Sequence, residues 1–462
     1  MTIQAAKAAL AHLDIDENPV SVRAKSRDFF WYSPVLKARL DHITADFVVA
    51  PKSEAEVIEV LRVAYAHNIP VTTRGAGTGN YGQAMPLAGG IILHTKHLNA
   101  VTEIHPGRVI VQPGCLLKDV DAATKAHSGQ ELRMFSSTHA TATIGGFIAG
   151  GSGGVGSCTW GALRDLGNII RLRVVTMEAE PRVLEFTGEE LHRVSHAYGT
   201  NGIITELEMP LAPAYDWVEL FVTTDTFPDA ATIAHDLSRE DGILKKLITV
   251  FEAPIAQDYF QRVAPHLRPG QALLGLMIAP HAMDGFLTFL ARSNATLIYR
   301  SDAHDWPRDP GPVYEYGWNH TTLRALKVDP TITYLQVRYA APDHLQKIEE
   351  IRAKLGGEVL QHLEVMKEAG TTMFAGLSIV KFTTEARLDE IVRIHEDLGC
   401  MVFNPHRYTL EEGGRQSVDD RQLAFKREAD PKGLLNPGKM IAWDDPAFAY
   451  TGVYAYKGMQ AK

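Results

Sequence analysis

The stretch IPVTTRGAGTGNYGQ, residues 69–83, decides the fold of this chain of 462 residues. Its first five residues have the apolar, β-branched character of a strand. Glycines follow at positions 75, 77, 79 and 82. Because glycine carries no Cβ, backbone N–H groups in such a loop can converge on an anion, and Arg74 adds a positive charge at the loop entrance. The stretch therefore predicts a strand leading into a phosphate-binding loop, with a plain flexible turn as the alternative.

Two common phosphate-binding folds do not fit this context. Gly77, Gly79 and Gly82 satisfy G-x-G-x-x-G, but the Rossmann fold needs a helix that begins at the loop. The residues that follow read QAMPLAGG, and Pro86 with two glycines prevents a helix from starting there. A Walker A loop is also excluded, because no Lys-Ser or Lys-Thr pair follows these glycines.

Strand-like and helix-like patterns alternate around the loop. Ser53 and Glu56 form a capping box before a helix whose apolar residues recur at helical spacing. The runs VTEIH and RVIVQ, joined by Pro106-Gly107, predict a hairpin. The other expected elements are strands at 46–51, 90–95, 169–177 and 202–210, a helix near 117–127, and a small-residue region at 136–157.

The character of the sequence changes near Pro210, after which glycine clusters become rare. Strand-like and helical runs alternate from here to residue 417, which predicts a separate α+β domain. Beyond it, VDDRQLAFKREADPKGLLNPGKM predicts a charged amphipathic helix stopped by Gly433 and Pro437. The expected strands of this half are 334–339 and 374–381, and the expected helices are 342–354 and 385–397.

Composition excludes several classes of function. The formal net charge of -9 offers no clustered basic footprint for nucleic acid. Three cysteines, far apart at 115, 158 and 400, predict neither a disulfide framework nor a zinc site. There is no secretory signal and no stretch of about 18 apolar residues. We therefore expect a soluble, cytoplasmic protein with a small-molecule substrate and no transmembrane segment; homo-oligomerisation stays open.

Several motifs in order resemble one family. The helix E-V-x-x-V-L-x-x-A, the strand I-P-V-T-T and the loop R-G-A-G-T-G-N are similar to the FAD domain of the vanillyl-alcohol oxidase / p-cresol methylhydroxylase (PCMH-type) superfamily. This superfamily includes FAD-linked oxidases that are glycolate oxidase- and D-lactate dehydrogenase-like. The later matches are Pro113-Gly114, T-I-G-G at 143–146, W-G-A-L-R-D at 160–165, G-T-N-G-I-I-T at 199–205 and D-P-K-G-L-L-N-P-G-K-M at 430–440.

The resemblance implies an α+β fold in three segments. Residues 1–215 would form a PCMH-type FAD-binding domain of two α/β subdomains. Residues 216–417 would form an α+β cap with an antiparallel sheet, and residues 418–462 would return to the FAD domain. The implied FAD-binding residues are Arg74, Gly75, Ala76, Gly77, Thr78, Gly79, Asn80, Pro113, Gly114, Ser137, Thr138, Thr143, Gly145, Gly146, Gly202, Ile203, Ile204 and Asn436.

Several relatives attach FAD covalently through a histidine in the first loop, but residues 74–83 contain none. Others use a cysteine in the later loop, where this chain has His139. We therefore expect non-covalent FAD, with His139 as a reserve attachment site. The metal-binding G-H-x-x-x-G-N-x-H motif of D-lactate and glycolate dehydrogenase-like members is absent as well. We expect no metal in the site.

Two polar clusters in residues 216–417 are candidates for the chemistry. One reads NPHRYTLEEGG, at 404–414, and the other reads YEYGWNHTT, at 314–322. A neutral imidazole is a suitable base near neutral pH, although each histidine has a structural role as its alternative. The catalytic candidates are His406, His320, Tyr408 and Glu412.

The substrate-binding candidates combine cationic and aromatic side chains. Arginine suits bidentate capture of a carboxylate, but each arginine can equally serve in a structural ion pair. The substrate-binding candidates are Arg338, Arg164, Tyr316 and Trp318.

Taken with the resemblance, these residues predict an FAD-dependent oxidase or dehydrogenase. It would oxidise a CH–OH group of a small polar or anionic substrate, such as a 2-hydroxy acid or related alcohol, by hydride transfer to flavin. Oxygen, a quinone or an electron-transfer protein would accept the electrons. Two alternatives stay open: an NADPH-dependent flavin reductase, and a flavin subunit that only passes electrons to a partner.

Overall fold

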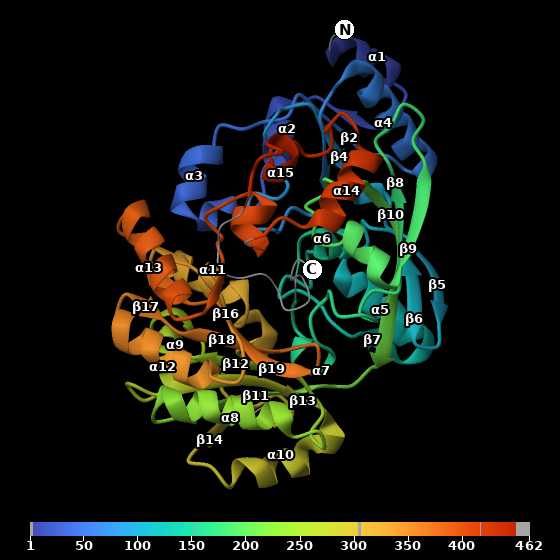
Figure 1. The fold of residues 1–462 in the computed structure, drawn as a ribbon. Helices are drawn as coiled ribbons and strands as arrows, with labels where there is room; N and C mark the ends of the chain where they lie inside the picture. Colours follow the sequence, from blue (N-terminus) through green and yellow to red (C-terminus); the bar gives the residue numbers. More distant parts are fainter. Residues whose placement is uncertain (1–2, 152, 304–305, 416, 450–462) are drawn as a thin grey trace.

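The computed structural model of the chain describes residues 3–151, 153–303, 306–415 and 417–449. The last part of the expected C-terminal segment, 450–462, lies outside the described residues. Four sheets organise the chain, and helices cover their faces (Figure 1). The α-helices are α1 Ile3–Ala9, α2 Pro19–Lys25, α3 Pro34–Leu40, α4 Glu54–His67, α5 Leu117–Ser128, α6 Ile144–Gly150, α7 Ser157–Trp160, α8 Phe227–Arg239, α9 Ile255–Tyr259, α10 Met283–Leu290, α11 Asn319–Val328, α12 His344–Leu355, α13 Glu385–Asp397, α14 Asp420–Ala429 and α15 Ile441–Asp444.

The first sheet contains the strand that leads into the glycine loop. Its order is β1-β2-β4-β3, with β2, β4 and β3 parallel and β1 antiparallel. Ser53 caps α4, as predicted, by accepting a hydrogen bond from Glu56 N at 3.2 Å. Apolar side chains of α1 and α4 then pack on this sheet. The strands are β1 Ile15–Asp16, β2 Phe47–Val49, β3 Val71–Arg74 and β4 Ile91–His94.

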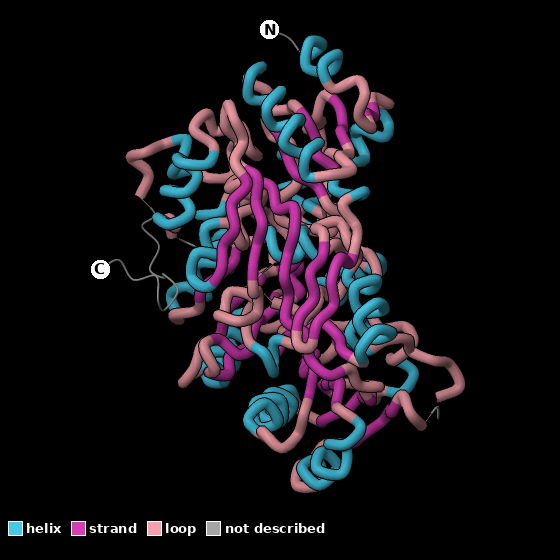
Figure 2. The backbone as a smooth tube through the Cα atoms, turned by 90° about the vertical axis from the view of Figure 1, so that its right-hand side faces the viewer, coloured by secondary structure: helices cyan, strands magenta, loops and turns pink. Residues whose placement is uncertain are grey.

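The second sheet is antiparallel, with the order β5-β6-β10-β8-β9 and β7 paired to β10. The predicted hairpin is confirmed, since β5 and β6 pair around Pro106-Gly107. Figure 2 shows the long strands of this sheet side by side near the middle of the molecule. The strands are β5 Val101–His105, β6 Arg108–Val111, β7 Gln130–Leu132, β8 Arg171–Val175, β9 Val183–Thr187 and β10 Ile203–Pro213.

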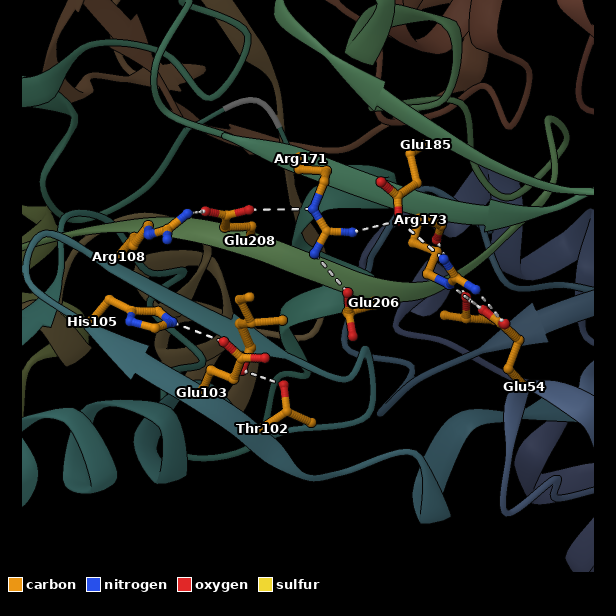
Figure 3. Close-up of polar contacts among 12 residues, drawn as sticks. Glu54, Thr102, Glu103, His105, Arg108, Arg171, Arg173, Glu185, Glu206 and Glu208 are labelled. Carbon is orange, nitrogen blue, oxygen red and sulfur yellow. Dashed lines mark hydrogen bonds and ion pairs between the residues drawn. The ribbon is translucent and has the colours of Figure 1, made fainter.

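An arginine–glutamate ladder crosses one face of the second sheet (Figure 3). Arg171 alone contacts three glutamates, and Arg173 continues the ladder to Glu54 at 2.8 Å. Because Glu54 is the first residue of α4, the ladder also joins the second sheet to the first. Exposed ion pairs stabilise a fold by only about 0–1 kcal/mol each, so the ladder chiefly fixes register.

Residues 216–417, which we call the cap, contain two antiparallel sheets. The larger has the order β14-β11-β13-β12-β18-β19-β16-β21, and the smaller has the order β15-β20-β17. Helices α8, α10, α12 and α13 pack on the larger sheet. The strands are β11 Val218–Thr224, β12 Lys245–Phe251, β13 Ala272–Ile278, β14 Thr296–Arg300, β15 Ile332–Tyr334, β16 Gln336–Tyr339, β17 Val359–Leu360, β18 His362–Glu368, β19 Thr371–Gly376, β20 Ile379–Lys381 and β21 Met401–Phe403.

Each of the two long strand-like runs of the cap is divided between two sheets, which corrects the prediction of continuous strands. The run 334–339 breaks at Leu335, and the run 374–381 breaks at Leu377 and Ser378. Leu335 N donates to Ser378 O at 3.1 Å, so both runs change sheets at the same place. Periodicity could not show this break, because Leu335 is apolar and as fully buried as Tyr334 and Val337 in the two strands on either side.

The cap and the glycine-rich half share a hydrophobic core, which includes Phe135 and Leu207 on one side and Phe221 and Phe251 on the other. A buried ion pair adds to this interface: Lys246 Nζ on β12 contacts Glu131 Oε1 on β7 at 2.6 Å. No helix in the described residues combines the length and the apolar character needed to cross a membrane.

The C-terminal segment returns to the first sheet, and its red ribbon in Figure 1 lies beside the blue N-terminal elements. After α14, Leu434 O accepts a hydrogen bond from Val71 N at 2.8 Å, and Asn436 N donates to Val71 O at 2.9 Å. The segment therefore pairs with β3 directly before the glycine loop.

Candidate functional site

A cavity of about 240 Å³ lies between the glycine-rich half and the cap. Three stretches that are distant in sequence converge on it, at 75–84, at 136–151 with Gly153, and at 194–204, and three side chains of the cap join them. The predicted FAD-binding residues that line it are Gly75, Ala76, Gly77, Thr78, Gly79, Asn80, Pro113, Ser137, Thr138, Thr143, Gly145, Gly146, Gly202 and Ile204.

The first glycine loop presents unpaired backbone donors. The N–H groups from Ala76 to Asn80 donate to no residue that the structure describes, although all five residues line the cavity. Ala76, Gly77, Thr78 and Gly79 are half-buried and Asn80 is buried, so these N–H groups are open to an acceptor in the cavity, whether water or a ligand oxygen. Successive amides of this kind form a cradle for a phosphate or pyrophosphate group.

Arg74 lies behind this loop rather than in the cavity, which corrects its expected direct contact with the cofactor. Its guanidinium donates to the carbonyl oxygens of Arg27 and, at 3.1 Å, Ala76. Gly77 lies against it with a φ of +72°, and a Cβ there would be 2.3 Å from Arg74 Nη2. Arg74 therefore fixes the loop from behind, and only glycine fits between them.

Three other predicted FAD-binding residues do not line the cavity. A Cβ on Gly114 would lie 2.0 Å from Thr95 O, so this glycine allows two chain segments to cross. Ile203 is buried in the core of the first sheet. Asn436 Nδ2 donates to Gln83 O at 2.8 Å and to Tyr198 O at 2.6 Å. Asn436 thus connects two segments that line the cavity, without lining it.

Asp28 also lines the cavity, although no motif in the sequence predicted it as a site residue. Its carboxylate accepts hydrogen bonds from Phe30 N at 2.9 Å and Ala84 N at 3.2 Å. Burial raises the pKa of Asp28 to about 6 and lowers the pKa of the nearby Lys439 to about 7. Lys439 Nζ donates to Gly82 O at 2.6 Å, so this pair fixes the far end of the glycine loop.

His406 is a structural residue in this fold, contrary to its predicted role as the base. It is 1% exposed; its Nδ1 lies 2.7 Å from Ser33 Oγ and its Nε2 lies 2.9 Å from Tyr334 O. Burial lowers the pKa of His406 to about 3, so the ring is neutral at physiological pH. With both ring nitrogens engaged, His406 has no free nitrogen to accept a proton from a substrate.

The other predicted catalytic side chains also lie away from the cavity lining. Burial lowers the pKa of His320 to about 4, and its buried Nδ1 has no hydrogen-bond partner among the described residues. Tyr408 packs against the cluster that includes Leu40 and Met85. Glu412 is exposed, and its carboxylate accepts a hydrogen bond from Thr409 Oγ1 at 3.3 Å. The two polar clusters of the sequence therefore do not bring these three side chains into the cavity lining.

Among the predicted substrate-binding residues, only Trp318 lines the cavity. Arg338 is paired with Glu368, and Arg164 Nη1 donates to Ser195 O at 3.2 Å. The hydroxyl of Tyr316 donates to Pro310 O at 2.7 Å within the core. These contacts correct the expectation of an arginine clamp, because the guanidinium of Arg338 binds a carboxylate of the protein itself.

Trp318, Asn319 and Gln336 form the cap side of the cavity. Trp318 has a φ of +51°, a conformation that costs a bulky residue about 1–3 kcal/mol. Such strain is retained only where surrounding contacts enforce it. Asn319 lies in the polar cluster 314–322 and Gln336 in the expected strand 334–339, but neither was named as a candidate, because nothing in the sequence distinguishes these amides from their neighbours.

The cavity lining contains no lysine, arginine or histidine among the described residues. His139 lies outside it, since its Nε2 contacts Asp121 Oδ2 at 2.7 Å and its ring packs on Phe135. Within the described part of the chain, no group of three or more histidine, cysteine, aspartate or glutamate residues is arranged to hold a metal ion.

Comparisons with known proteins agree with this geometry. The family model described as FAD binding domain matches residues 45–185. The glycolate oxidase subunit GlcD of Bacillus subtilis is 32% identical over 453 residues, which cover 86% of this chain and 89% of that protein. The D-lactate dehydrogenase of Archaeoglobus fulgidus is 31% identical over 204 residues, covering 42% of this chain and 45% of that protein.

Other matches are more limited. An uncharacterized FAD-linked oxidoreductase of Mycobacterium tuberculosis is 30% identical over 182 residues, and the chain spans only 38% of its length. Among solved structures, an alkyldihydroxyacetonephosphate synthase has a TM-score of 0.70 at 15% identity and covers 95% of this chain and 88% of its own. This likeness concerns the fold alone.

Replacing Gly77 by valine should abolish FAD retention. The branched side chain would meet the Arg74 guanidinium and would have to adopt a φ of +72°, which β-branched residues avoid. FAD per protein, measured from the absorbance of purified protein, should fall from about one to near zero. Gly242→Val is the matched control, because a Cβ there meets nothing within 4 Å. Unchanged FAD content in Gly77→Val would disprove the assignment of this loop.

Proposed function

The chain belongs to the FAD-linked oxidoreductases, and from this premise we propose that it oxidises a CH–OH group of a small polar molecule in the cavity. One observation carries the proposal: the predicted FAD-binding segments and three cap side chains line the same cavity. When bound there, FAD supplies the group that accepts a hydride from carbon. The chain itself has to hold the cofactor, orient the substrate and exclude water.

A 2-hydroxy acid is the substrate class that the relatives favour. Glycolate oxidase and D-lactate dehydrogenase are named for such acids, and the former aligns over most of both chains. The described cavity lining offers neutral hydrogen-bonding groups in place of a cationic clamp. The substrate oxygens would therefore bind to the side-chain amides and backbone donors of the residues that line the cavity.

We also propose that FAD is held without a covalent bond. Covalent attachment needs a nucleophilic side chain beside the flavin, and neither histidine nor cysteine lines the cavity among the described residues. The three cysteines are all buried elsewhere, and burial raises the pKa values of their thiols. Thiols of this kind are poor nucleophiles.

The function is tested by anaerobic bleaching of the flavin absorbance in the purified holoprotein. We expect glycolate, D-lactate, L-lactate or gluconate to bleach it, since each carries a CH–OH group next to a carboxylate. Benzyl alcohol serves as the neutral comparison. Bleaching by NADPH alone would instead identify a flavin reductase, and bleaching by none of these compounds would leave an electron-transfer subunit.

Acid precipitation separates the two modes of FAD attachment. Because no covalent bond has to be broken, acid should release FAD into the supernatant in a molar amount equal to that of the precipitated protein. Flavin that stays in the pellet and migrates with the denatured chain on a gel would contradict non-covalent binding.

A further inference from the structure

Two side-chain amides lie in contact on the cap side of the cavity. Asn319 is the first residue of α11, and Gln336 is the first residue of β16. Both residues line the cavity, and Gln336 Nε2 donates a hydrogen bond to Asn319 Oδ1 at 3.4 Å. A hydrogen bond of this length is weak, so the two amides can exchange it for bonds to a bound molecule.

The remaining polar groups of this pair are accessible rather than buried. Asn319 Nδ2 and Gln336 Oε1 have no hydrogen-bond partner among the described residues. Both side chains are half-buried, and neither contains a buried polar atom that lacks a partner. The indole nitrogen of Trp318 beside them, in contrast, is covered by protein atoms. The cavity lining therefore offers a free amide N–H and a free carbonyl oxygen next to each other.

Each of the two amides extends from a fixed backbone. Directly before Asn319, the backbone N–H of Trp318 donates to Glu364 Oε1 at 2.5 Å, which joins the start of α11 to a buried side chain of β18. Gln336 lies in a strand that is paired on both sides, with β19 and with β21. Groups that are held in place lose less conformational entropy when a ligand binds to them.

Two amides in mutual contact have a defined hydrogen-bonding capacity. Each side-chain amide carries a donor group and an acceptor group, so one bond between them leaves a donor and an acceptor free, whichever way the planar groups are turned. A hydroxyl group both donates and accepts, and it matches this pair with two hydrogen bonds. A carboxylate only accepts, so it matches the free N–H but not the free carbonyl oxygen.

The charge of the cavity agrees with recognition of a neutral group. Its described lining contains no lysine, arginine or histidine, and it includes the carboxyl group of Asp28. Arg338, two residues beyond Gln336 on β16, is paired with Glu368. Polar recognition on the cap side therefore depends on neutral side chains.

We propose that Asn319 and Gln336 are specificity-determining residues that bind the hydroxyl group of the substrate, with the free amide N–H donating to the hydroxyl oxygen and the free amide carbonyl accepting from the hydroxyl O–H. The proposal rests on the proposed function and names the part of the substrate that the cap recognises. In a 2-hydroxy acid, this part is the hydroxyl group next to the carboxylate.

Two acids that do not reduce flavin isolate the contribution of the hydroxyl group. 2-Hydroxyisobutyrate carries a hydroxyl group but no hydrogen on the same carbon, so it has no hydride to transfer. Isobutyrate has the same carbon skeleton without the hydroxyl group. Isothermal titration calorimetry of the oxidised holoprotein gives both dissociation constants. We expect the wild type to bind 2-hydroxyisobutyrate roughly 5- to 50-fold more tightly, since a neutral hydrogen bond contributes about 2- to 10-fold.

Gln336→Met and Asn319→Leu each remove one amide and keep a side chain of similar size. In each variant the preference for 2-hydroxyisobutyrate should fall roughly 2- to 10-fold, the range for one neutral hydrogen bond. The affinity for isobutyrate and the FAD content should stay at the wild-type level. Gln346→Met is the matched control, because Gln346 is an exposed residue of α12 that bonds to Glu350 outside the cavity lining.

Anaerobic stopped flow provides a second measurement with a substrate that reacts. For whichever of glycolate, D-lactate and L-lactate reduces the flavin, the apparent dissociation constant should rise roughly 2- to 10-fold in Gln336→Met and in Asn319→Leu. The Gln346→Met control should behave as the wild type does.

The outcomes separate this proposal from the proposed function. Reduction of the wild-type flavin by one of these acids, with an unchanged preference for 2-hydroxyisobutyrate in both variants, would overturn only the role of the amide pair. Equal wild-type affinity for 2-hydroxyisobutyrate and isobutyrate would overturn it as well. Loss of FAD from both variants would assign the amides to the cofactor and contradict their role toward the substrate. A wild-type flavin that none of the acids reduces would overturn the 2-hydroxy acid substrate and this proposal together.

Discussion

The unpaired backbone amides between Ala76 and Asn80 are the feature on which the rest of this structure depends. Five consecutive N–H groups face a cavity without an acceptor in the described protein. A loop in this state is suited to bind an anion in front, provided that it has rigid support from behind. The support comes from the buried Arg74 guanidinium and from Lys439, which donates to Gly82 O. The chain belongs to a family of FAD-linked oxidoreductases, so the pyrophosphate of FAD would be this anion.

The same constraint accounts for the path of the chain. Val71 bonds to Leu434 and Asn436 on the C-terminal segment, so residues more than 350 positions apart meet directly before the loop. Asn436 then connects the carbonyl oxygens of Gln83 and Tyr198. The glycine loop is thus supported by residues from the C-terminal segment. This arrangement makes the C-terminal motif part of the cofactor site even though none of its side chains lines the cavity.

Most of the residues predicted to bind the cofactor line one cavity, whereas most of the candidates predicted in the cap lie outside it, and the difference has a physical reason. A glycine is needed wherever the backbone passes too close to another group to leave room for a Cβ, as at Gly77 and Gly145. Such positions can be recognised from the glycines in the local sequence alone. Side-chain roles in the cap depend on distant partners. His406 bonds to Ser33, 373 residues away, and nothing near His406 in the sequence indicates that contact. Trp318 was predicted as a substrate-binding residue. Its strained backbone, and the hydrogen bond that its backbone N–H donates to Glu364, follow only from the packed structure.

A crystal structure of the protein with FAD tests the central claim most directly. The account predicts that the pyrophosphate oxygens accept hydrogen bonds from the backbone between Ala76 and Asn80. It also predicts that Trp318 of the cap lines the same cavity as the bound cofactor. A pyrophosphate bound elsewhere, with these five amides paired to protein or bulk water, would contradict it.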